Sequence, residues 1–94
     1  MKVVLKRQPQ IALAAIASFV ESENTEGSGK RFIVKFVKFI EKSAVTKVKF
    51  ALCHHHILAS LKYSCIIFNK WVIAFAIENN SMVVHKIIHG TILK

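Results

Sequence analysis

The chain has 94 residues, of which 53% are hydrophobic, and its fourteen Lys and Arg against five acidic residues give a formal net charge of +9. This length suits one domain, placed at residues 1–94, and the apolar content excludes an intrinsically disordered chain. The charge excludes no fold, but it predicts an acidic partner such as nucleic acid, an anionic membrane surface or an acidic protein.

A short strand followed by a helix is predicted for residues 2–8 and 10–23. The segment KVVLKRQ has the β-branched centre of a strand, and Pro9 after it fits a first helical turn, where N–H groups lack partners. From Gln10 to Glu23, apolar residues recur at spacings of three and four, which is typical of an amphipathic helix.

A second helix is predicted for residues 30–42, after the polar turn ENTEGSG at 23–29. Its apolar stripe comprises Phe32, Ile33, Phe36, Val37 and Ile40. The opposite side carries Arg31, Lys35, Lys38 and Lys42, and we call these four residues the cationic helix face. Because the connection is short, we expect the two helices to form an antiparallel hairpin.

The remainder is predicted as a loop followed by three strands. Residues 43–60 show no clear periodicity and are expected to be loop or irregular extended chain. Residues 61–68, 71–77 and 82–88 are β-rich and are separated by Asn-containing turns, which predicts an antiparallel meander. The fold class is therefore α+β, in the order β-α-α-β-β-β, with the helical hairpin packed on one face of the sheet.

Two features bear on the cellular compartment. Cys53 and Cys65 form no recognisable framework, so half-buried free thiols in a reducing cytosol are favoured over a single disulfide. Basic residues followed by IALAAIASFV are similar to a signal peptide, but apolar residues within the basic segment and Pro9 argue against one. Lys or Glu interrupts every apolar run before about eighteen residues, so we expect no membrane span and a cytoplasmic protein.

The histidine triplet beside Cys53 raises the question of a metal site. Adjacent residues in extended chain point in opposite directions, so only His54 and His56 of the triplet could share an ion. No CxxC or HExxH spacing supplies further ligands. We therefore interpret His54, His55 and His56 as a polar loop and predict neither a metal nor another cofactor.

His85 and His89 are four residues apart on the last predicted strand, so their side chains should share one face, with Ile87 between them. In one interpretation, His85 lies at the rim of the sheet and His89 caps the strand end by a hydrogen bond. In the other, one of them is a general acid or base, assisted by Lys62, Lys70 and Lys86 if the open face of the sheet brings these groups together.

The order of elements and the last third of the chain resemble the RelE/ParE superfamily, the small basic toxins of bacterial type II toxin–antitoxin pairs. The residues that carry this resemblance are Leu61-Lys62, the strand Trp71-Val72-Ile73 with Phe75, the turn from Glu78 to Ser81, and the ending His89-Gly90. Two departures from the family pattern are Lys62, where Arg is usual, and the ending Thr91 to Lys94 in place of Arg and Asp.

The resemblance implies growth inhibition by ribosome-dependent mRNA cleavage or by action on DNA gyrase, neutralised by an acidic antitoxin in a hetero-oligomeric complex. The candidate catalytic residues are Lys62, His85 and His89; contacts to the target or to nucleic acid are assigned to Lys62, Lys70, Lys86 and Lys94. The cationic helix face is the candidate contact for the antitoxin. Two alternatives stay open: a non-catalytic basic module that binds nucleic acid or an acidic protein, and a cationic secreted or membrane-active peptide.

Overall fold

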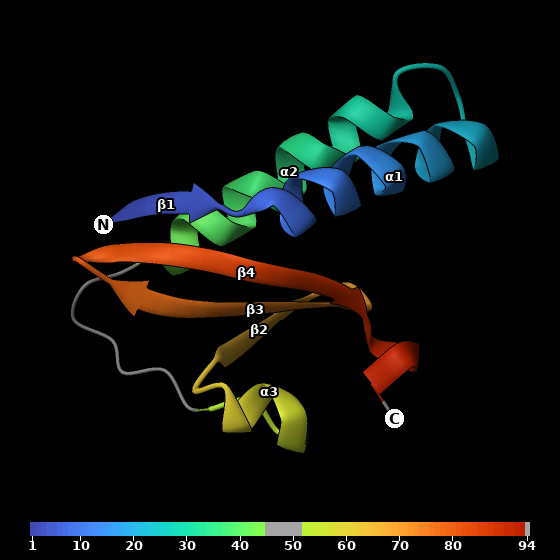
Figure 1. Ribbon diagram of the computed structural model, residues 1–94. Coiled ribbons are helices and arrows are strands. Elements are labelled where there is room, and N and C mark those ends of the chain that lie inside the picture. The colour runs from blue at the N-terminus through green and yellow to red at the C-terminus, as the bar shows by residue number, and fades with distance from the viewer. Residues whose placement is uncertain (45–51, 94) are drawn as a thin grey trace.

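The computed structural model describes residues 1–44 and 52–93 and confirms the predicted order of a strand, two helices and three strands (Figure 1). A one-turn helix, α3, precedes the meander, and a 3-10 turn, η1, follows it. The elements are β1 (Lys2–Leu5), α1 (Arg7–Glu23), α2 (Ser28–Ser43), α3 (His56–Ser60), β2 (Ser64–Phe68), β3 (Trp71–Glu78), β4 (Ser81–His89) and η1 (Gly90–Leu93).

The four strands form one sheet in the order β1-β4-β3-β2. The meander β2-β3-β4 is antiparallel as predicted, and β1 joins it in parallel beside β4. Asn79 and Asn80 in the β3–β4 turn have φ angles of 50° and 58°, and two consecutive positive φ values indicate a type I′ turn. Asn tolerates this conformation, so the turn residues determine where the hairpin reverses.

The α1–α2 hairpin covers one face of the sheet, and α3 lies on the other side (Figure 1). Phe36 and Ile40 of the predicted apolar stripe are fully buried, and they pack with Leu13 and Ile16 of α1. The sheet contributes Ile73, Phe75, Met82, Val84 and Ile87 to the same core. We call this side of the sheet the helix face and the opposite side the outer face.

The outer face has a smaller core of its own. Ala74 on β3 is fully buried there beneath Cys53 and Leu58, with Tyr63 and Cys65 packed around them. These residues come from the segment that leads into and out of α3. The outer face is thus covered in part by α3 and the residues that flank it.

Two local predictions need correction. Helix α1 begins at Arg7 rather than Gln10, since a proline also fits the third position of the first turn, where its N–H would have no partner. Residues 56–60 of the predicted irregular segment form α3. Packing of Leu58 stabilises this helix, and its sequence shows no helical periodicity that would have predicted it. Residues 45–51 of that segment lie outside the described residues.

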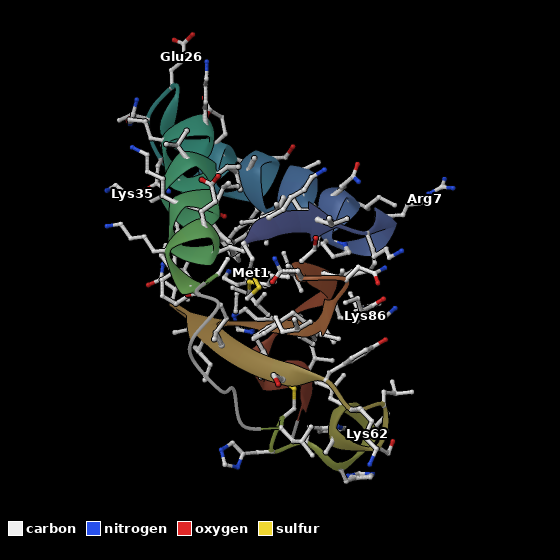
Figure 2. All side chains as sticks on the ribbon, turned by 90° about the vertical axis from the view of Figure 1, so that its left-hand side faces the viewer. Met1, Arg7, Glu26, Lys35, Lys62 and Lys86 are labelled. Atoms are coloured by element: carbon white, nitrogen blue, oxygen red, sulfur yellow. A yellow bond between two sulfur atoms is a disulfide. The ribbon has the colours of Figure 1, made fainter. Side chains whose placement is uncertain are left out.

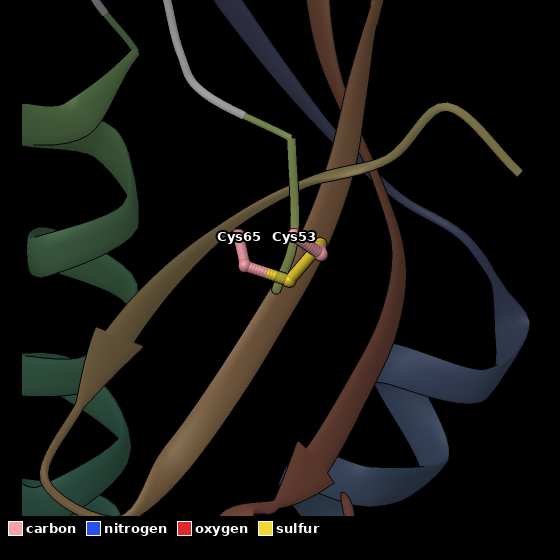
Figure 3. The surroundings of a disulfide bond; sticks show 2 residues. All are labelled: Cys53 and Cys65. Carbon is pink, nitrogen blue, oxygen red and sulfur yellow. A yellow bond between two sulfur atoms is a disulfide. The ribbon is translucent and has the colours of Figure 1, made fainter. Parts of the chain in front are cut away.

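The prediction of free thiols is wrong, because Cys53 and Cys65 form a disulfide with their Cα atoms 4.9 Å apart (Figure 3). An isolated bridge between Leu52 and Ser64 brings the two chain segments side by side, and the cysteines follow directly on each. The pairing of Leu52 with Ser64 is a tertiary contact, so the cysteine spacing alone gave no indication of it.

Candidate functional site on the outer face of the sheet

A β-bulge in β4 determines which side chains can act together. Ser81 to Val84 pair with β3 in one register and Lys86 to His89 in a register shifted by one residue, which leaves His85 as the extra residue. His89 therefore lies opposite Trp71 on the helix face, whereas His85 lies on the outer face. The prediction that the two histidines share one face is wrong, because the bulge breaks the alternation on which it rested.

The bulge has a second effect, on Lys86. Lys86 pairs with Ala74, whose side chain belongs to the outer face, so the consecutive residues His85 and Lys86 both project from that face. The Lys86 side chain is exposed to solvent. The side chains of His85 and Lys86 are thus neighbours on the outer face.

His85 makes two defined contacts, with Tyr63 and Glu78. Its ring stacks on that of Tyr63 with centroids 4.7 Å apart and planes inclined by 14°. Its Nε2 atom lies 2.7 Å from Oε2 of Glu78. The His85 side chain is 21% exposed and that of Glu78 48%, so solvent reaches the pair. We call Tyr63, Glu78 and His85 the outer-face cluster.

This arrangement fixes the chemistry available to His85. A carboxylate only accepts hydrogen bonds, so Nε2 of His85 carries the proton that Glu78 accepts. In the neutral imidazole, Nδ1 then holds the free lone pair and can accept a proton. A base oriented by a carboxylate is the geometry used for general acid–base work, and the imidazolium form can instead donate to a phosphate oxygen.

The end of α3 positions Tyr63 over His85. The N–H of Lys62 donates to the carbonyl of Ala59 at 2.9 Å and that of Tyr63 to the carbonyl of Leu58 at 3.2 Å, which together form a Schellman motif. Lys62 occupies the left-handed position of this motif with a φ of 65°. Glycine is favoured there, so a lysine at this position is a local strain of the kind that accompanies functional sites.

His89, on the helix face, contacts Trp71 and Thr91. Its ring meets Trp71 edge-on with centroids 4.9 Å apart, and its Nδ1 accepts the backbone N–H of Thr91 at 3.3 Å and lies 2.7 Å from Thr91 Oγ1. Because a backbone N–H can only donate, Nδ1 is an acceptor and the neutral ring is protonated at Nε2. His89 thus caps the start of η1, as the first interpretation of this residue predicts.

The predicted cations fall into separate groups. Lys86 and Lys62 lie on the sheet and at the end of α3, far from Lys35 on the helical hairpin (Figure 2). Lys70 is in the β2–β3 turn and lines a cavity of about 270 Å³ together with Trp71 and His89 on the helix face. Lys94 lies outside the described residues. The structure therefore does not bring Lys62, Lys70, Lys86 and His89 together as one set.

The cationic helix face is exposed along α2, as the periodicity predicts. Arg31 at its start reaches back to the preceding turn, where its guanidinium donates to Thr25 Oγ1 at 3.2 Å and to the Glu26 carbonyl at 3.5 Å. Lys35 extends away from the molecule (Figure 2). These side chains form a basic surface distinct from the outer-face cluster.

Two further cavities lie beside the disulfide and beside α1. One, of about 550 Å³, opens beside the disulfide and is lined by Cys53, Cys65, Leu58, Val72 and the first two residues of the histidine triplet, among others. The other, of about 430 Å³, lies between α1 and the Trp71–His89 end of the sheet and is almost wholly apolar. His55 and His56 stack at 4.9 Å, and within residues 1–44 and 52–93 no three metal-ligating side chains come together.

The sequence predicted no role for Tyr63 and placed Glu78 only in a turn. Glu78 precedes the Asn79-Asn80 turn on the same face of β3 as Ala74, so the hairpin register could have indicated its proximity to β4. Tyr63 lies within the predicted strand 61–68, but in the structure it precedes β2, and its position over His85 depends on the end of α3, which the sequence did not predict.

No protein-family model matches this chain, and no curated protein sequence matches it. Across the part of the chain that the structure describes, no helix has both the length and the apolar content to cross a membrane.

Proposed function

We propose that this chain is the toxin of a bacterial type II toxin–antitoxin pair with a RelE/ParE-like fold, acting in the cytoplasm and neutralised by a cognate acidic antitoxin. The observation that carries the proposal is the bulge that places His85 and Lys86 together on the outer face, with Glu78 and Tyr63 against the imidazole. The order of elements and the charge of +9 support it.

In this proposal the outer face binds the target. Lys86 and Lys62 contact the phosphate backbone of ribosome-bound mRNA, and His85 acts as the general base for the 2′-hydroxyl proton or as the acid for the leaving oxygen. The two ammonium groups offset the charge that develops on the reacting phosphate. His89 and Lys70, on the helix face, are left out of this set. Gyrase is the alternative target, reached through the same basic surface.

The antitoxin is assigned to the other side of the molecule. The cationic helix face on α2 is exposed, and an acidic segment laid along it would gain charge complementarity over several turns. The complex formed in this way would be a hetero-oligomer.

A specific observation favours the second candidate, a non-catalytic basic module that binds nucleic acid or an acidic protein. His89 lies on the helix face, so the predicted catalytic set of Lys62, His85 and His89 is reduced to Lys62 and His85, with Glu78 and Tyr63 beside the imidazole. Binding needs only the cations, whereas cleavage needs a group for each proton transfer.

Expression in a bacterial host tests the proposal, with His85→Ala and His89→Ala as the matched pair of variants. We expect the wild type and His89→Ala to arrest growth, His85→Ala to be harmless, and co-expression of an adjacent gene for a small acidic protein to relieve the arrest. Harmless expression of the wild type contradicts the toxin. If the purified chain then binds RNA with an affinity that falls steeply with salt, the basic module is favoured.

An assay of mRNA cleavage on ribosomes separates the two targets. Cleavage that His85→Ala abolishes and His89→Ala retains supports the nuclease. Growth arrest without cleavage, accompanied by loss of gyrase supercoiling, supports the gyrase target and removes His85 as an acid–base group.

A further inference from the structure

The disulfide between Cys53 and Cys65 joins the segment before α3 to strand β2 (Figure 3). Both cysteines belong to the same small core as Tyr63 of the outer-face cluster. Residues 52–63 contribute little to the outer core, since Cys53 and Leu58 are the two buried side chains of this segment. Among the described residues, the isolated bridge of Leu52 with Ser64 joins the backbone of this segment to the sheet. Non-covalent forces thus hold the segment weakly, and the disulfide contributes a large share of its attachment.

The same segment holds Tyr63 in place. The N–H of Cys53 donates to the Tyr63 carbonyl at 2.9 Å, and the N–H of Tyr63 donates to the Leu58 carbonyl at 3.2 Å. Tyr63 is therefore bonded on one side to the disulfide cysteine and on the other to the buried residue of α3. Its ring stacks on the His85 ring. A change in how the segment is attached to the sheet would therefore act on the imidazole through the Tyr63 side chain.

We propose that the Cys53–Cys65 disulfide is a redox control of the outer-face cluster. In the disulfide state, α3 and Tyr63 are fixed against the sheet and Tyr63 covers one face of the His85 ring. In the dithiol state, the segment detaches and the face of the imidazole that Tyr63 covers becomes open to a target. The regulatory role of the disulfide rests on the proposed function. The structural coupling of the disulfide to Tyr63 and His85 is independent of that function.

The redox step requires a cellular dithiol as reductant. Its thiolate attacks one sulfur, at Cys65 because Cys53 is buried and Cys65 is half-exposed, and forms a mixed disulfide while Cys53 leaves as thiolate. The second thiol of the reductant then displaces Cys65. Two electrons and two protons pass to the protein, which gains two thiols, and the reductant becomes a disulfide. The cavity of about 550 Å³ that both cysteines line gives a thiol access to the bond.

The redox state of the disulfide, and with it the state of the outer-face cluster, depends on the cellular compartment. The cytosol keeps most thiols reduced, and cytosolic disulfides are usually transient and regulatory. The protein would therefore work in the dithiol state in a reducing cytosol, and oxidation would close the segment over His85.

The test compares the full chain by NMR before and after a dithiol reductant. The His85 ring resonances, identified by their loss in His85→Asn, should shift on reduction because the ring current of Tyr63 is removed. The amides of Cys53 and Tyr63 should exchange with solvent about a hundredfold faster, as expected for loss of a cross-link that closes a short loop. The amides of Lys6 and Gly90, which bond to β4 and to the β2–β3 turn, are internal controls and should not change.

The double variant Cys53→Ser, Cys65→Ser provides the matched control. It should match the reduced wild type without reductant and should not respond when reductant is added. Identical His85 resonances in the oxidised and reduced wild type overturn the inference, as do two titratable thiols in protein purified under air.

Growth arrest by the wild type and by the double variant separates this inference from the proposed function. Arrest by both, with His85 resonances that do not respond to reductant, overturns the redox control and leaves the toxin standing. A clear response of His85 to reductant without any arrest overturns the toxin and retains the coupling.

Discussion

The side-chain amide of Gln8 pairs with both backbone polar groups of Ile87. The Ile87 N–H donates to Oε1 at 2.9 Å, and Nε2 donates to the Ile87 carbonyl at 3.1 Å. Strand β1 ends at Leu5, and the N–H of Lys6 makes the last backbone bond to this edge of β4, at Val84. Gln8, in the first turn of α1, thus continues the pairing of β4 past the bulge where no strand is present.

Gln8→Ala should lower the free energy of unfolding by about 1–2 kcal/mol, because it leaves a partly buried N–H and carbonyl of Ile87 unpaired. Urea denaturation measures the change. Gln10→Ala is the control, since its side-chain bond to the Leu5 carbonyl is exposed and should be worth less. Equal losses in the two variants would contradict the role given to Gln8.

Gly29→Ala should destabilise the α1–α2 hairpin by about 1–3 kcal/mol, the range for forcing extra atoms into packed structure. A Cβ at Gly29 would lie 2.3 Å from the carbonyl oxygen of Ala17, so the helices must separate. Thermal unfolding followed by circular dichroism checks this. In Gly90→Ala the new Cβ meets the Lys70 carbonyl at 3.2 Å, and a smaller loss is expected. A Gly29→Ala protein as stable as the wild type would show that the helices do not approach this closely.

Glu21→Gln should make the protein less stable at neutral pH and should change the pH dependence of its stability. The Glu21 carboxylate accepts the N–H of Gly27 at 2.6 Å and that of Gly29 at 2.8 Å. These bonds, with a smaller effect of Arg31, lower the pKa of Glu21 below its usual 4.5. A lowered folded-state pKa gives stability that is present above pH 4.5 and is lost as the pH falls through the folded value.

The difference in Tm between the wild type and Glu21→Gln should therefore be largest near neutral pH and shrink below pH 4.5 as the carboxyl group becomes protonated. A Tm difference that stays constant from pH 7 to the acid range would refute this account. Glu23→Gln, two residues further along α1, controls for the change of one charge.

Lys62→Gly should stabilise the protein by about 1 kcal/mol while weakening any function of the outer face. Lys62 has a φ of 65°, a conformation that costs most residues about that much and glycine almost nothing. Lys62→Ala removes the same charge without relieving the backbone, so it separates the two effects. Denaturation gives the stability, and the growth assay gives the function. A stabilised Lys62→Gly variant with undiminished growth arrest would remove Lys62 from the site.

Lys86→Ala should reduce the salt dependence of RNA binding by about one unit in the slope of log K against log salt, as for the loss of one phosphate contact. Filter binding over a range of salt concentrations measures the slope. Lys35→Ala, on the distant cationic helix face, should leave it unchanged (Figure 2). The reverse pattern would place nucleic acid on the helical hairpin.

Much of the fold could be predicted because its signals are local. The stripe containing Phe36 and Ile40 lies within one helix, and the turn Asn79-Asn80 specifies its own hairpin. The exposed face of α2 follows from the same period. For the candidate site, Lys62 and His85 stay predictions, Tyr63 was not predicted, and the expectation that His85 and His89 share one face was wrong.

The sequence by itself determined the order of elements, the two amphipathic helices, the meander and the positive charge, because each depends on residues that are neighbours in the chain. Only the tertiary structure decided that His85 separates from His89, that Cys53 bonds to Cys65, and that Tyr63 meets the imidazole. The bulge, the bridge at Leu52 and the packing of Leu58 are contacts between distant segments. These features depend on how the whole sheet packs, so the residues on either side of each of them in the chain do not predict it.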